Sequence, residues 1–109
     1  MLTEPKKFLK EAIMANLTIV AKIIVMPEHA DFVKEEMLKL IPPTTQEKGC
    51  VYYNLHQDNE DSRAFIWVEA WETKEDWHAH NNSAHIQAYR AATGEFVEDR
   101  IIYQMTQIG

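Results

Sequence analysis

The fold is constrained most by the order in which strand-like and helix-like hydrophobic patterns follow each other along the chain. Residues 17–25 (LTIVAKIIV) form a nearly continuous apolar run rich in β-branched side chains, which is typical of a strand covered on both faces. A helix-like segment follows, then strand-like runs at 50–56 and 64–71, a second helical region and a last strand-like run at 97–108. This order predicts an α+β, ferredoxin-like β-α-β-β-α-β fold with helices on one face of a four-stranded antiparallel sheet.

The first helical segment has predictable ends. We expect it to open at Pro27 and to stop at Pro42 and Pro43, because proline has no amide hydrogen and its ring crowds the preceding turn. Residues 44–48 then form a tight connector, and Gly49 supplies the turn into the next strand.

The second helical region is predicted to consist of two pieces. Thr73 and Ser83 are the expected N-caps, since a hydroxyl can accept a hydrogen bond from an early helix amide. The break falls near Asn82, and Gly94 is the expected C-terminal stop.

The length of 109 residues, with 46% hydrophobic side chains, fits one domain. We assign residues 1–13 to an N-terminal extension and residues 14–109 to the domain. The strands at 17–25 and 64–71 carry bulky apolar side chains on both faces, more than one layer of helices can cover. We therefore expect a homodimer that packs sheet against sheet.

Charge and cysteine content exclude several function classes. A formal net charge of -6 argues against nucleic acid or an anionic membrane surface as the main partner. Cys50 is the only cysteine, which excludes an intrachain disulfide and a cysteine-based zinc site. No apolar run approaches the roughly 18 residues of a membrane span. We expect a soluble, cytoplasmic protein.

The chemically active side chains concentrate between residues 69 and 92, where three of the five histidines lie. On a helix, His78 and His80 point about 200° apart, and His80 and His85 about 140° apart, whereas helical metal ligands need a spacing of three or four residues. We therefore expect no metal. The chain has no G-x-S-x-G hydrolase motif and no glycine-rich nucleotide-binding motif.

What remains is a predicted pocket between helix and sheet, built from aromatic rings and a few polar groups. Such a pocket suits a flat, partly apolar ligand, and an imidazole in it could accept a phenolic proton near neutral pH. The residues expected there are Tyr53, Asn54, Glu69, Trp71, Trp77, His80 and His85. Structural roles stay open: the tryptophans could be core, Glu69 could cap the backbone or pair with Arg63 or Arg90, and His78 should face solvent.

Several of these residues also form a recognisable pattern. The segments Glu47-Lys48-Gly49-Cys50 and Glu69-Ala70-Trp71-Glu72, followed by Ala79-His80 and Ala84-His85 before Tyr89, resemble the antibiotic biosynthesis monooxygenase superfamily, especially its quinol monooxygenase-like members. The resemblance covers residues 17 to about 108. It implies a dimeric α/β barrel, in agreement with the fold and dimer expected above.

The resemblance also implies a mechanism, oxidation of a small aromatic phenol, quinol or polyketide-like substrate by O2 without a cofactor. It implies catalytic roles for His80, His85 and Glu69. The substrate-binding roles fall to Tyr53, Asn54, Trp71 and Trp77. The chain departs from many members at Ala84, where they have proline before the second histidine.

Other functions occur on similar folds. Haem-degrading relatives use a helix tryptophan, which Trp77 would match, but Gln87 stands at the spacing of their axial histidine and the first strand has no asparagine in its body. An isomerase of a phosphorylated signalling molecule shares the two-histidine pattern. A non-catalytic module that binds a small ligand is a third alternative.

Overall fold

The computed structural model describes residues 16–109. Its elements are β1 (Leu17–Val25), a 3-10 turn η1 (Pro27–His29), α2 (Ala30–Leu38), α3 (Ile41–Thr45), β2 (Cys50–Gln57), β3 (Ala64–Trp71), α4 (Lys74–Asn81), α5 (Ala84–Thr93), a 3-10 turn η2 (Gly94–Phe96) and β4 (Val97–Thr106). The predicted order of strands and helices is confirmed. The predicted extension at 1–13 and the start of the domain at residue 14 lie outside the described residues.

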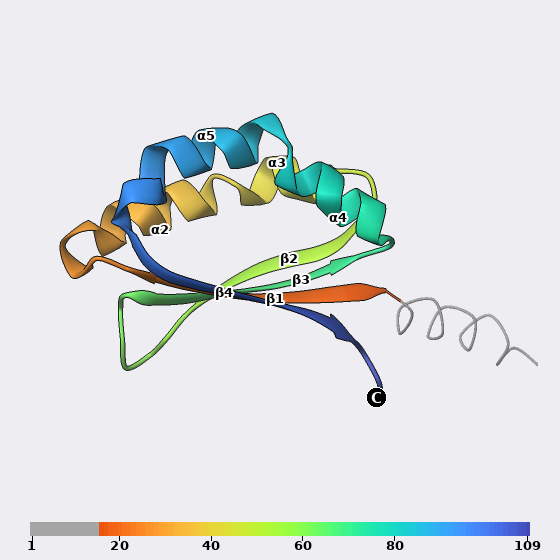
Figure 1. The fold of residues 1–109 in the computed structure, drawn as a ribbon, viewed down its shortest axis with the longest axis horizontal. Coiled ribbons are helices and arrows are strands. Elements are labelled where there is room, and N and C mark those ends of the chain that lie inside the picture. The colour runs from red at the N-terminus through yellow and green to blue at the C-terminus, as the bar shows by residue number, and fades with distance from the viewer. Residues whose placement is uncertain (1–15) are drawn as a thin grey trace, which may run out of the picture.

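The four strands form one antiparallel sheet in the order β2-β3-β1-β4. The helices lie together on one face of it (Figure 1). β2 and β3 pair as the predicted hairpin, and β1 lies between β3 and β4. This is the ferredoxin-like α+β arrangement. The dimeric barrel remains a prediction.

The core fills the space between the helices and the sheet. Alternate residues of β1 and β3 point toward the helices, because successive side chains of a strand face opposite sides. The largest fully buried side chains include Trp71, Phe65, Ile19 and Met37. Burying side chains of this size stabilises the fold by roughly 1.5–3 kcal/mol each.

The opposite face of the sheet is also apolar. Val20, Val68 and Tyr103 lie opposite one another across β3, β1 and β4 and point away from the helices. Val20 and Val68 are only half buried, and Tyr103 is exposed, as are Ile101 and Met105 on the same face of β4. The apolar surface that was predicted to exceed what the helices cover therefore lies on this face.

The prediction for the first helix was wrong in two respects: the helix ends before the two prolines, and part of the predicted connector 44–48 is helical. α2 ends at Leu38, and a separate short helix, α3, begins at Ile41 with both prolines in its first turn. Proline is accepted there because the first-turn amides have no acceptor within the helix, so no hydrogen bond is lost. α3 leads directly into the turn that carries Glu47.

The second helical region is divided as predicted. Thr73 Oγ1 accepts a hydrogen bond from the Asp76 amide at 3.0 Å, and Ser83 Oγ accepts one from the Ile86 amide at 3.4 Å. α5 ends next to Gly94, which keeps a right-handed φ of -54° and continues into η2. Within residues 16–109, no helix is long and apolar enough to cross a membrane.

Candidate functional site

A cavity of about 390 Å³ lies between the sheet and the helices. That volume is in the range of small-molecule sites. Four of the predicted site residues line it: Tyr53, Glu69, Trp77 and His80. They come from β2, β3 and α4, so only the folded chain brings them together.

The walls of the cavity combine aromatic rings with aliphatic side chains. Tyr53 and Trp67 stack with ring centroids 4.2 Å apart and an interplanar angle of 26°. Their neighbouring positions follow from the β2–β3 register, in which Tyr53 lies opposite Glu69 and Leu55 opposite Trp67. Trp77 of α4 lines the cavity too. Such walls suit a flat ring system.

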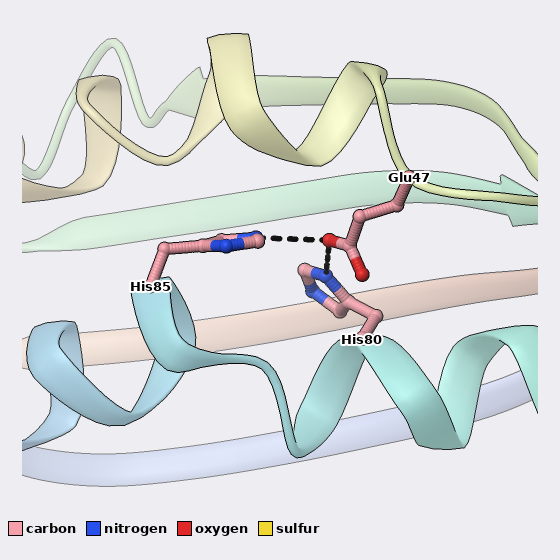
Figure 2. Close-up of side chains that lie close together, drawn as sticks. All are labelled: Glu47, His80 and His85. Atoms are coloured by element: carbon pink, nitrogen blue, oxygen red, sulfur yellow. Dashed lines mark hydrogen bonds and ion pairs between the residues drawn. The ribbon is translucent and has the colours of Figure 1, made fainter.

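At the edge of this cavity, two histidines meet one carboxylate. His80 Nδ1 lies 2.6 Å from Glu47 Oε2, and His85 Nε2 lies 2.9 Å from the same oxygen (Figure 2). Helical spacing separates the two histidines on one continuous helix. They converge here because the chain breaks between α4 and α5, and Glu47 reaches both from the turn before β2.

His80 is held firmly in place. Its side chain is 3% exposed, and its ring packs against Trp71 at 4.8 Å and Tyr53 at 5.2 Å between centroids. Burial lowers the pKa of His80, while the hydrogen bond and charge of Glu47 oppose that shift. With Nδ1 donating to Glu47, Nε2 is the unprotonated nitrogen left to accept a proton.

His85 lies outside the cavity and is more exposed, with 24% of its side chain accessible. Its Nε2 also lies 3.2 Å from Thr44 Oγ1 and 3.3 Å from Ser83 Oγ. Both hydroxyls and the Glu47 carboxylate therefore lie around one nitrogen, which restrains the orientation of the His85 ring. Of the two histidines, only His80 lines the cavity.

Glu69 is a second buried carboxyl in the cavity, 5% exposed. Its Oε1 accepts a hydrogen bond from the Trp71 indole at 2.9 Å. Neither arginine offered as a partner pairs with Glu69 in the described chain: Arg63 pairs with Asp61 and Glu98, and Arg90 donates to the Asn81 carbonyl. Burial raises the pKa of Glu69 to about 7, against the opposing hydrogen bond from Trp71.

The other predicted residues lie elsewhere. Trp71 is fully buried beneath His80 and does not line the cavity. Asn54 is exposed on the opposite face of the sheet, because it neighbours Tyr53 on β2 and strand side chains alternate. His78 is exposed, as expected.

Several residues of the site were not among the site residues predicted from sequence. Glu47 belongs to the segment quoted for the family resemblance, but nothing local to that segment reveals that it meets two histidines. The remaining ones line the cavity: Trp67, Tyr89, Arg90 and Arg100. The apolar alternation of β3 could have marked Trp67, since it shares a face with Glu69.

Glu47, His80 and His85 also have the composition of a two-histidine, one-carboxylate metal site, with ligand atoms within 4.8 Å of one another. The distances of 2.6 and 2.9 Å from Glu47 Oε2 are those of hydrogen bonds. Ligands around one tetrahedral ion with bonds near 2.1 Å lie about 3.4 Å apart. The observed spacing therefore fits shared protons, and the absence of a metal stays a prediction.

The chain is similar to known proteins over most of its length. A family model described as antibiotic biosynthesis monooxygenase matches residues 16–92. No curated protein sequence matches the chain. A solved structure of a Pseudomonas aeruginosa protein is similar, with 29% identity, a TM-score of 0.84, and coverage of 89% of this chain and 98% of that one.

Two further structures share the fold. A conserved protein from Methanosarcina mazei has 23% identity and a TM-score of 0.83, covering 91% of this chain and 99% of that one. A protein named antibiotic biosynthesis monooxygenase has 23% identity and a TM-score of 0.80, covering 85% and 99%.

Proposed function

The chain belongs to the antibiotic biosynthesis monooxygenase family, and we propose that it is an enzyme that oxidises a small aromatic phenol or quinol with O2 without a cofactor. The observation that carries this proposal is the Glu47–His80 pair, 2.6 Å apart, with His80 lining an aromatic cavity. A buried imidazole oriented by a carboxylate is the standard arrangement of a general base.

In the proposed reaction, His80 Nε2 removes the phenolic proton of the substrate. The electron-rich anion transfers one electron to O2, and the radical pair combines to form a carbon–oxygen bond. Cleavage of the peroxide leaves one oxygen atom in the product as a carbonyl and releases the other as water, with the proton returned from His80. The substrate loses two hydrogens, the phenolic proton and the hydrogen of the reacting carbon, so it supplies all the electrons and no external reductant is required.

Glu69 and Tyr53 would support this step by hydrogen bonding. With its pKa near 7, Glu69 is partly protonated at neutral pH. The Trp71 indole bonds to Oε1, which leaves Oε2 as the oxygen that could donate to a ligand. Burial raises the pKa of Tyr53, which keeps its phenol protonated. Both groups can therefore donate to a substrate oxygen as negative charge develops on it.

The test is oxygen uptake with 1,4-dihydroxynaphthalene and with anthrone, in buffer freed of metals by a chelating resin. His80→Ala should lower kcat by about 100-fold or more, the usual contribution of a general base. Glu47→Gln keeps the side-chain size but removes the charge that orients His80, and we expect about a tenfold fall.

His78→Ala is the matched control, since His78 lies on the same helix but is exposed. It should leave uptake unchanged. Melting curves of each variant identify any loss of folding. Full turnover by folded His80→Ala and Glu47→Gln proteins would remove the assigned base. If no phenol consumes oxygen above background, the isomerase or ligand-binding alternative replaces the oxygenase.

A further inference from the structure

The cavity has a second polar region, separate from the Glu47–His80 pair. Arg90 of α5 and Arg100 of β4 both line it, and Tyr89 lies next to them. β4 is one of the two edge strands of the sheet, and its residues Arg100 and Ile102 line this side of the cavity. Two exposed arginines therefore border a cavity that is otherwise mostly apolar.

Neither arginine is neutralised by a carboxylate of the described chain. The ion pairs found in residues 16–109 involve Lys39, Arg63, His80 and His85, and none includes Arg90 or Arg100. Arg90 instead donates from Nη1 to the main-chain carbonyl of Asn81 at 3.2 Å. In a chain of net charge -6, two such arginines at one cavity are a local excess of positive charge.

Tyr89 adds a buried polar atom without a partner. Its phenolic oxygen is buried, and no hydrogen bond of good geometry reaches it from the described residues, although the Thr93 side chain lies close to it. The neighbouring Thr93 hydroxyl donates instead to the Tyr89 main-chain carbonyl at 2.7 Å. A buried hydroxyl left unpaired costs about 1–3 kcal/mol. Tyr89 lines the cavity, so a small rotation of its ring would let a ligand oxygen accept this proton and recover that energy.

From Tyr89, Arg90 and Arg100, we propose that the substrate is an aromatic phenol that carries an anionic oxygen substituent, such as a carboxylate. The ring occupies the aromatic cavity, the phenol faces His80, and the anion is held by the two arginines and the Tyr89 hydroxyl. Guanidinium groups suit this role because they present several donors to an oxyanion and remain charged. This assignment rests on the proposed aromatic-binding function of the same cavity.

The test compares naphthalene ligands that carry or lack an anionic oxygen group, under nitrogen so that none is oxidised. Calorimetry at pH 7.5 measures binding of 2-naphthol, 6-hydroxy-2-naphthoate and 2-naphthyl phosphate to the full chain. We expect the carboxylate to bind about tenfold more tightly than 2-naphthol, with the preference falling as salt is raised. Tighter binding of the phosphate than of the carboxylate would support the anion site and assign it to a phosphoryl group.

Substitutions test whether the two arginines and Tyr89 cause the preference for the anionic ligand. Arg90→Gln with Arg100→Gln should abolish the preference for the anion while leaving 2-naphthol binding unchanged. Tyr89→Phe should weaken the binding of 6-hydroxy-2-naphthoate but not that of 2-naphthol. It should leave the melting temperature equal or higher, because it removes an unpaired buried hydroxyl. The control is Arg63→Gln, since Arg63 pairs with Asp61 and Glu98 away from the cavity.

The outcomes separate this inference from the function on which it rests. Equal affinity for 2-naphthol and 6-hydroxy-2-naphthoate overturns the anion site but leaves an aromatic cavity. An anion preference that survives in the double arginine variant also overturns it. If none of the three ligands binds, the aromatic-binding function itself fails.

Discussion

At the scale of single residues, the site depends on groups whose chemistry is changed by burial. Glu69 is the clearest case, because a carboxyl is normally ionised at neutral pH and this one has a pKa of about 7. Its surroundings are the stacked rings of Tyr53 and Trp67 and the indole of Trp71. A protonated carboxyl in an aromatic cavity is a hydrogen-bond donor, which an ordinary surface glutamate is not.

This pKa predicts a pH dependence of stability. Glu69 has a folded pKa above the ordinary glutamate value of 4.5, so its proton is bound more tightly in the folded state. Its contribution is fully present below pH 4.5 and is lost as the pH rises through about 7. A rise from 4.5 to about 7 corresponds to roughly 3 kcal/mol, as an order of magnitude.

Urea unfolding of the wild type and Glu69→Gln at pH 5 and pH 8 measures this effect. Glutamine keeps an acceptor for the Trp71 indole but does not ionise. The variant should therefore gain stability relative to the wild type at pH 8 and not at pH 5. If the free energy of unfolding of the two proteins depended on pH in the same way, ionisation of Glu69 would not destabilise the fold.

At the scale of elements, the turn between α3 and β2 positions the site. It carries Glu47, and it ends at Gly49, which has a φ of +80°. A Cβ at Gly49 would overlap the carboxylate of Asp76 at the start of α4. The turn and the helix that carries His80 thus approach each other at a point where only glycine fits.

Gly49→Ala should destabilise the protein by about 1–3 kcal/mol, through left-handed strain and the overlap with Asp76. Thermal unfolding measures the change. Gly94→Ala is the control, because Gly94 has a right-handed φ of -54° and a Cβ added there would meet no atom within 4 Å. Equal melting temperatures for the two variants would contradict the tight approach at Gly49.

At the scale of the whole molecule, the sheet has two apolar faces and the helices cover one (Figure 1). The uncovered face includes Val20 and Val68 of the central strands and the exposed Ile101, Tyr103 and Met105 of β4. Tyr103 and Met105 are 51% and 50% exposed, unusually accessible for large apolar side chains grouped on one surface. We propose that a second copy of the chain covers this face.

Light scattering after size exclusion tests the dimer. The wild type should have about twice the chain mass of 12.7 kDa. Tyr103→Glu places a charge in the proposed interface and should shift the mass toward 12.7 kDa. Phe32→Glu, a change at a comparably exposed ring on α2, should leave the dimer intact. A wild type that elutes as a monomer at micromolar concentration would overturn the proposal.

Much of this protein follows from its sequence alone. A nearly continuous apolar run predicts β1 and further strand-like runs predict the other strands. The hydroxyls of Thr73 and Ser83 predict the starts of α4 and α5, and His80 and Glu69 line one cavity as expected. These features are local: periodicity and capping depend on neighbours within a few residues. The end of α2 was mispredicted because proline is excluded from a helix interior but accepted in a first turn, and the sequence does not distinguish the two settings.

The composition of the site was decided by the tertiary structure. Helical spacing separates His80 from His85, yet the break between α4 and α5 turns both toward Glu47, which is 33 residues before His80. Asn54 and Trp71 were expected to contact the ligand, but strand alternation and depth in the core place them elsewhere. Tyr89, Arg90 and Arg100 enter the cavity because α5 and β4 meet in space. Contacts between distant segments depend on how helices pack on the sheet, and no local pattern encodes that packing.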